Sequence, residues 1–141
     1  MRVQDVMNRN HPSIYADELA TKARAVLRDT GFRVLPVVDE YKRLLGIITR
    51  NNVMTISSSV STVRVQGIMS RVRFTVTLDM DSVQAVREMM RLDEWYAPVL
   101  KSTQDNTYVG MFGLEHVMKA FYDKKASWLS TPLSQIMSTG K

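Results

Sequence analysis

The sequence contains no cysteine and only two histidines, and both shortages exclude whole classes of protein. Without cysteine the chain forms no disulfide, no thiolate metal site and no cysteine nucleophile. The histidines, His11 and His116, are not at a metal-ligand spacing such as His-x-x-x-His. A glycine-rich phosphate loop of the Walker type is also missing. We therefore expect no metal site and no enzymatic activity.

Long apolar runs are absent as well, and no segment approaches the length of a membrane span. The first residues, Met1–Asp5, lack the apolar stretch of a secretion signal, so we expect a cytoplasmic location and no membrane partner. A hydrophobic content of 45% over 141 residues is enough for a folded core. The formal net charge of +5 favours anionic partners without naming one.

The most informative feature that is present is an internal repeat. Val3–Met7 recurs 62 residues later as Val65–Met69, and the offset persists through the following helix and strand patterns. From Gly46 and its counterpart Gly110 onward the offset is 64, because the second copy has a longer turn at 101–106. Insertions belong in surface turns, so the alignment indicates a duplicated fold.

Each copy has the pattern of the same small α/β (α+β) unit. In copy one, a short strand around Ser13 precedes an amphipathic helix that ends at Gly31. Val34–Val38 and Leu44–Ile48 then predict a hairpin, and a second helix follows. Pro36 indicates an edge position or an irregular strand start. One strand–helix–strand–strand–helix unit buries little apolar area, so we expect the copies to pack as a pseudo-twofold pair through their sheets.

These patterns divide the chain into repeat 1 over residues 1–56, a serine-rich linker over 57–64 and repeat 2 over 65–122. Residues 123–141 form a C-terminal extension. Within it, Leu133–Met137 resembles the start of repeat 2. This similarity suggests the beginning of a third repeat, and hence further repeats in a longer chain.

The duplicated unit resembles the cystathionine-β-synthase (CBS) domain. In copy one the resemblance lies in Asp5–Met7, Phe32–Asp39, Leu45–Thr49 and Val53–Met54. In copy two it is weaker and lies in Gly67–Met69, Tyr96–Val99 and Val109–Phe112. It covers the chain to about residue 120. The resemblance implies a two-repeat (Bateman) module that often dimerises and commonly binds adenine nucleotides, although some members bind S-adenosylmethionine or nucleic acid.

The resemblance implies a nucleotide site at the strand-to-helix junction around Thr49, whose hydroxyl either caps the helix or contacts a phosphate. Arg33 and Arg50 are candidate phosphate ligands, and a solvated surface arginine is the alternative for each. Asn52 stands where the family has a ribose-binding aspartate, so it keeps an acceptor oxygen without the charge. The nucleotide-binding residues predicted in this way are Ser13, Ile14, Arg33, Val34, Ile47, Thr49, Arg50 and Asn52.

Copy two departs from this pattern. Gly113 replaces the threonine and His116 replaces the asparagine, so the hydroxyl is lost. Trp95 and Tyr96 are suited either to stacking on a base or to packing in the core or in a dimer interface, and packing is favoured. We expect one competent site in copy one and a weaker site made of Thr75, Val76, Trp95, Tyr96, Gly113 and His116.

The sequence leaves several functions open. The first is a regulatory, homodimeric sensor that binds AMP, ADP or ATP in the cleft between the repeats and requires no cofactor. A sensor of S-adenosylmethionine is a variant of it. Nucleic-acid binding is less favoured, because a stacking platform is not evident beside the basic cluster of Arg64, Arg71 and Arg73. A plain oligomerisation module would use the methionine-rich helices that carry Met89, Met90 and Met118.

Overall fold

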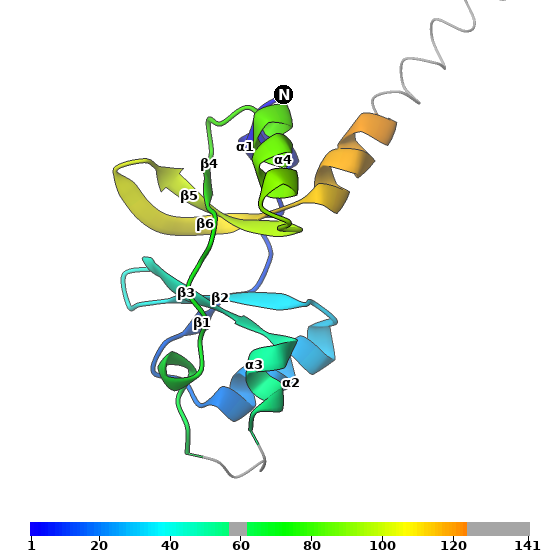
Figure 1. Cartoon of the computed structure of the whole chain (residues 1–141). Helices are drawn as coiled ribbons and strands as arrows, with labels where there is room; N and C mark the ends of the chain where they lie inside the picture. The colour runs from blue at the N-terminus through cyan, green and yellow to red at the C-terminus, as the bar shows by residue number, and fades with distance from the viewer. Residues whose placement is uncertain (57–61, 124–141) are drawn as a thin grey trace, which may run out of the picture.

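The two repeats form two stacked halves in the computed structural model, which describes residues 1–56 and 62–123 (Figure 1). The first part of the chain forms α1 (Val3–Val6), β1 (Ile14–Tyr15), α2 (Ala20–Thr30), β2 (Val34–Val38), β3 (Leu44–Thr49) and α3 (Arg50–Met54). The second part forms the 3₁₀-helix η1 (Val65–Gly67), β4 (Val76–Thr77), α4 (Ser82–Arg91), β5 (Tyr96–Ser102) and β6 (Asp105–Gly113), and residues 114–123 are helical.

The two sheets face each other across the middle of the molecule, and the longer helices lie on their outer sides (Figure 1). The predicted pair of strand–helix–strand–strand–helix units packed through their sheets is confirmed. Most of the predicted linker and the segment that resembles a third repeat lie outside the described residues.

Both halves have a three-stranded sheet of the same topology, β1-β2-β3 in one and β4-β5-β6 in the other. The first strand runs parallel to the middle strand, and a hairpin adds the third strand antiparallel. All of β2 is buried, including Pro36, so this proline lies in a central strand and the edge position predicted as one possibility is wrong. The strand tolerates it because β1 pairs with β2 only at Val37 and Val38. At Pro36 the strand therefore has a neighbour on one side only.

Helix α2 of repeat 1 and helix α4 of repeat 2 end in the same left-handed turn. Gly31 has φ 75°, and its N–H donates to the carbonyl of Leu27 at 3.0 Å, as the sequence predicted for a glycine at this position. The equivalent residue of repeat 2 is Asp93, with φ 56°. At the other end of α4, Asp81 caps the helix by accepting from the N–H of Gln84 at 3.1 Å.

The two halves exchange their N-terminal arms. The first arm, residues 1–8, contributes Val3 to the hydrophobic core of repeat 2, while the second arm, residues 64–70, contributes Val65 to the core of repeat 1. Both valines are 0% exposed. The sequence pattern assigns the first arm to repeat 1, but in space this arm completes repeat 2. Neither core is therefore closed without a segment that leads into the opposite repeat.

Each arm also pairs with the hairpin that it crosses. Ser70 of the second arm exchanges backbone hydrogen bonds of 2.8 and 3.0 Å with Ile47 of β3. Asn8 of the first arm makes the same exchange with Met111 of β6, at 2.8 and 2.9 Å. These four bonds tie the repeats together along their pseudo-twofold contact.

The pairing requires glycine beside it in both hairpins. A Cβ on Gly46 would lie 2.8 Å from the carbonyl oxygen of Ser70, and a Cβ on Gly110 would lie 2.6 Å from that of Asn8. Both obstacles are backbone atoms, which cannot move aside as a flexible side chain can. The duplicated glycine of the sequence thus marks the places where the backbones of the two repeats meet.

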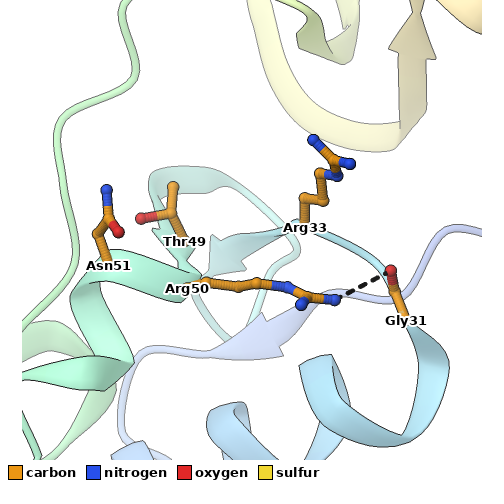
Figure 2. Close-up of a pocket in the computed structure, with 5 residues that line it drawn as sticks. All are labelled: Gly31, Arg33, Thr49, Arg50 and Asn51. Atoms are coloured by element: carbon orange, nitrogen blue, oxygen red, sulfur yellow. Dashed lines mark hydrogen bonds between the residues drawn. The ribbon is translucent and has the colours of Figure 1, made fainter.

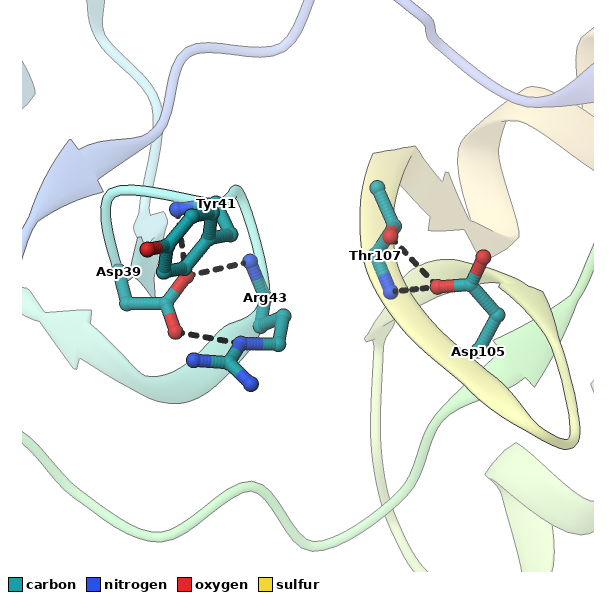
Figure 3. A network of polar contacts seen from close by, with 5 residues as sticks. All are labelled: Asp39, Tyr41, Arg43, Asp105 and Thr107. Atoms are coloured by element: carbon teal, nitrogen blue, oxygen red, sulfur yellow. Dashed lines mark hydrogen bonds and ion pairs between the residues drawn. The ribbon is translucent and has the colours of Figure 1, made fainter.

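The two hairpin turns lie next to each other and are each held by an aspartate (Figure 3). Asp39 accepts from the N–H groups of Tyr41 and Arg43, both at 2.9 Å, and its second oxygen pairs with Nε of Arg43 at 2.7 Å. Burial acts to raise the pKa of Asp39, but the bonds from Arg43 and Tyr41 outweigh it and hold the pKa below its usual value. In the other turn Asp105 accepts from the N–H of Thr107 at 3.0 Å, and Thr107 forms a backbone bridge to Arg43.

We expect Val3→Ala and Val65→Ala each to lower the free energy of unfolding by about 2 kcal/mol, because each removes two buried methyl groups and leaves a cavity. Urea denaturation measures the change. Val83→Ala is the matched control, since Val83 is 41% exposed on α4 and its truncation should cost no more than about 0.5 kcal/mol. Equal effects of all three substitutions would contradict the exchange of arms.

Candidate anion-binding site

A basic pocket lies where β3 continues into α3. It has a volume of about 490 Å³ and is lined by Gly31, Arg33, Thr49, Arg50 and Asn51. In Figure 2, Arg50 reaches across to the turn at Gly31, and Arg33 points toward the strands of repeat 2. The pocket therefore joins the end of α2, the start of β2 and the junction of β3 with α3.

The junction is held by a reciprocal cap between Thr49 and Asn52. The Oδ1 of Asn52 accepts from the N–H of Thr49 at 2.7 Å and from its hydroxyl at 2.9 Å. In return Oγ1 of Thr49 accepts from the N–H of Asn52 at 3.4 Å. The Nδ2 of Asn52 donates to the hydroxyl of Ser70 in the second arm at 2.9 Å. The side chain of Asn52 thus ties the start of α3 to repeat 2 and is not part of the pocket lining.

The two arginines of the pocket have no carboxylate partner within residues 1–56 and 62–123. Arg50 makes only a long bond of 3.4 Å to the carbonyl of Gly31, and Arg33 makes no hydrogen bond to any described residue. Five other cations of the described residues have a carboxylate within 3.2 Å, namely Lys22, Arg28, Arg43, Arg73 and Arg91, whereas the rest have none. Arg33 and Arg50 are notable because both line one pocket. Two uncompensated guanidinium groups at one pocket create a positive potential that favours an anion.

The pocket brings together three of the eight side chains that the sequence predicted for this site, namely Arg33, Thr49 and Arg50. Among the other five, Ile14 and Val34 are buried in the first half. Ile47 is half-buried in β3, and Ser13 and Asn52 lie outside the lining. Of the predicted polar residues, the arginines and the threonine line the pocket, whereas Ser13 and Asn52 do not.

Gly31 and Asn51 line the pocket although the sequence did not single them out for it. Gly31 was recognisable as a helix end, but only the folded chain brings its carbonyl opposite Arg50. Asn51 directly follows Arg50 in the junction motif, so its place beside the predicted residues was the available signal.

The equivalent junction of repeat 2 has the opposite chemistry. Trp95 and Leu114 stand at the positions that Arg33 and Arg50 occupy in repeat 1. They line a smaller pocket of about 160 Å³ together with Met89, Met90, Asp93 and Glu94. Apolar and acidic side chains have replaced the arginines, so this pocket does not favour an anion.

The other residues predicted for a weaker second site are distributed over repeat 2. Val76 is buried in the core and Thr75 is half-buried before it. Tyr96 bonds to a carboxylate oxygen of Glu115 through its hydroxyl at 3.4 Å. Burial raises the pKa of Tyr96 and the Glu115 charge adds to this, whereas the charge of Arg33 acts in the opposite direction. Arg33 thus exerts its field across the boundary between the repeats.

His11 is a buried structural side chain at that boundary. Its Nε2 lies 2.7 Å from the carbonyl of Val34, which can only accept, so Nε2 carries the hydrogen. The ring contacts Phe32 with centroids 4.2 Å apart. Burial lowers the pKa of His11, against the raising effect of the bond to Val34.

Among the described residues, no group of three or more histidine, aspartate or glutamate side chains is arranged to hold a metal ion.

The family model of the CBS domain matches residues 3–59 and 65–123, so the chain belongs to the CBS domain family and contains two tandem copies. Homoserine O-acetyltransferase of Methanococcus vannielii is 25% identical over 119 residues, which are 82% of this chain and 24% of that protein. The chain thus spans about a quarter of the length of this curated relative. In the part of the chain that the structure describes, no helix has the length and apolar character needed to span a membrane.

Several solved structures share the fold of this chain. A protein from Methanocaldococcus jannaschii is 26% identical with a TM-score of 0.77, over 87% of this chain and 60% of that one. CBSX2 in complex with AMP is 18% identical with a TM-score of 0.77, over 88% of this chain and 98% of that one. A CBS domain pair in complex with 5′-methylthioadenosine and S-adenosyl-L-methionine is 22% identical with a TM-score of 0.72, over 88% and 98%.

We expect Asn52→Ala to lower the free energy of unfolding by about 1–2 kcal/mol, because it removes both the helix cap and the bond to Ser70. Thermal or urea unfolding checks this. Asn51→Ala, one residue earlier and exposed, should change the stability by less than about 0.5 kcal/mol. Asn52→Asp keeps the acceptor and loses the donor, so its stability should fall between those of the wild type and Asn52→Ala. A loss for Asn51→Ala as large as for Asn52→Ala would refute this account of the junction.

Proposed function

We propose that this CBS pair is a regulatory module that senses a phosphate-bearing adenine nucleotide and binds its phosphate in the basic pocket. The observation that carries the proposal is the pair of uncompensated arginines, Arg33 and Arg50, beside Thr49 in one pocket. Guanidinium groups bind phosphate oxygens through paired, charge-assisted hydrogen bonds. The complex of CBSX2 with AMP supports the choice of an adenine nucleotide.

The nucleoside would extend from the pocket along the boundary between the repeats. Val34 follows Arg33 in β2, and Ile47 lies two residues before Thr49 in β3. We assign the half-buried Ile47 to the apolar side of the base, as ligand sites combine apolar walls with few polar anchors, whereas the buried Val34 would reach the base only after a rearrangement. The carboxamide of Asn52 is occupied by the cap and by Ser70, so ribose binding through it requires a rearrangement.

The proposal gives one tight site per chain. At the equivalent junction of repeat 2, Trp95 and Leu114 replace the arginines, and the carboxylate of Asp93 repels a phosphate, while Glu94 of the same pocket is paired with Arg73. The positive charge of the pocket in repeat 1 should also favour binding of nucleotides over S-adenosylmethionine, which carries a cationic sulfonium and no phosphate. A solved CBS pair binds S-adenosyl-L-methionine, so this ligand is a required comparison in the test.

Binding would act by shifting an equilibrium between two arrangements of the repeats, because a ligand changes only states that bind it unequally. The phosphate would draw together the end of α2, the start of β2 and the junction held by Asn52. Since Asn52 is bonded to Ser70 in the second arm, such a movement would be transmitted to repeat 2.

Isothermal titration calorimetry tests the proposal with AMP, ADP, ATP, adenosine and S-adenosylmethionine. We expect one equivalent of at least one nucleotide to bind, with adenosine much weaker. Arg33→Ala should weaken nucleotide binding about tenfold or more, since a hydrogen bond to a charged group contributes about 1.5–3 kcal/mol. Arg91→Ala is the control: Arg91 is paired with Glu88 in repeat 2, and its loss should leave the affinity unchanged.

Two outcomes would overturn the proposal. One is binding of adenosine as tight as that of AMP, which would mean that the phosphate is not recognised. The other is tight binding of an oligonucleotide with a steep salt dependence and no binding of any mononucleotide, which would indicate a nucleic-acid surface.

We also propose that the chain self-associates through the outer helices of repeat 2. Met90 on α4 is 69% exposed. On the last helix, residues 114–123, Met118 is 64% exposed, and Phe121 and Tyr122 are exposed as well. Exposed large apolar side chains are typical of protein interfaces, and Met118, Phe121 and Tyr122 lie within five residues of one helix. Met89, which the sequence suggested for the same interface, is 1% exposed and belongs to the core instead.

Sedimentation velocity tests the self-association. We expect the wild type to sediment as a dimer and Met118→Glu to sediment as a monomer, because the substitution places a charge in an apolar contact. Tyr41→Ser, at an exposed hairpin turn away from these helices, should remain dimeric. A monomeric wild type at high protein concentration would contradict this proposal.

A further inference from the structure

The last helix of the described chain is capped by a histidine. The Nδ1 of His116 accepts from the N–H of Gly113 at 2.9 Å, at the start of the helical residues 114–123. The equivalent bond in repeat 1 runs from the N–H of Thr49 to Oδ1 of Asn52 at 2.7 Å. The two repeats therefore close the same strand-to-helix junction with different chemical groups, an imidazole and a carboxamide.

These two caps respond differently to protons. An imidazole nitrogen accepts a hydrogen bond only while it is unprotonated, so His116 must be neutral and carry its hydrogen on Nε2. On protonation Nδ1 becomes a donor that faces the N–H of Gly113, and a positive charge appears at the positive end of the helix dipole. The carboxamide of Asn52 has no such transition between pH 5 and 8.

Several charged or titratable groups surround His116. Its own helix supplies Glu115, with Oε1 at 3.8 Å from Nε2, and Lys119. From the segment before β1, the charge of His11 interacts with it. Asp5 of the first arm and Asp123 line a pocket of about 380 Å³ together with His116 and Lys119. Burial lowers the pKa of His116, Glu115 opposes this, and Lys119 adds to it.

We propose that His116 is a proton-sensitive helix cap, whose protonation releases the first turn of the last helix from β6 while the junction of repeat 1 stays closed. The folded state favours the neutral imidazole over the charged one. The stability that the cap contributes is therefore complete above the usual pKa of histidine and is lost as the pH falls below it. This regulation is independent of the proposed nucleotide, because the cap binds no ligand.

Release of this turn would affect both the core and the boundary between the repeats. Val117, 4% exposed, holds the helix in the core of repeat 2. The ring of Tyr96 lies against Gly113, since a Cβ there would be 3.0 Å from two ring carbons, and the Tyr96 hydroxyl bonds to Glu115. Acidification would thus loosen the part of repeat 2 that faces Arg33.

Amide hydrogen exchange by NMR tests the cap directly, after correction for the intrinsic pH dependence of exchange. We expect the protection of the Gly113 amide to fall about fivefold from pH 7.5 to pH 5.5, which corresponds to the loss of one helix cap. The amide of Thr49, held by Asn52, should show no such change and serves as the internal control.

The repeats themselves supply the matched variant. In His116→Asn, which copies the cap of repeat 1, the protection of the Gly113 amide should become independent of pH. His11→Gln removes the other histidine, whose charge interacts with His116, and the fall in Gly113 protection on acidification should persist in this variant. If His116→Asn does not fold, the ¹⁵N chemical shifts of the wild-type imidazole test the proposal instead. They report which ring nitrogen carries the hydrogen, and the proposal requires it on Nε2 and not on Nδ1 at pH 7.5. A pH-independent Gly113 amide in the wild type, or hydrogen on Nδ1, would overturn the proposal.

Discussion

The structure depends on the exchange of the two arms between the repeats. Each half lacks one buried valine of its own core and receives it from the segment that leads into the other half. The backbone pairing at Ser70 and Asn8 then fixes how the two sheets face each other, and Gly46 and Gly110 leave the room for it. A single repeat would expose a gap in its core, so the pair is the unit of folding. Because the second arm bonds to Asn52 at the strand-to-helix junction, the same contacts also position the residues of the proposed ligand site.

This near-symmetric scaffold carries two different junctions. The first has arginines, a threonine and an asparagine cap, whereas the second has Trp95, a glycine and a histidine cap. The backbone is alike in both, as the shared left-handed turns at Gly31 and Asp93 show. The two repeats therefore share a fold but differ in side chains: one junction has a positive pocket, which we propose binds a phosphate, and the other has a histidine cap, which we propose responds to protons.

Much of the fold could be predicted from the sequence because its determinants are local or periodic. The repeat of Val3–Met7, the hairpin patterns and Gly31 at the helix end were each readable along the chain. The exchange of arms could not be predicted, since the same apolar residues satisfy a core in either repeat and only packing decides between them. The sequence also did not predict that a central strand would contain Pro36. The strand tolerates this proline because β1 is short and pairs with β2 only at Val37 and Val38.

The sequence could predict that Arg33, Thr49 and Arg50 come together, because their places in the motif put them at one strand-to-helix junction, and they do line one pocket. That this pocket binds a ligand stays a prediction. The site was not predictable where side chains have alternative partners: the sequence allowed Asn52 to face a ribose, and the structure has it bonded to Thr49 and Ser70. A crystal structure of the chain with AMP tests the central claim most directly. The account predicts one nucleotide per chain with phosphate oxygens within hydrogen-bonding distance of Arg33 and Arg50. A nucleotide bound beside Trp95, with the first junction empty, would contradict it.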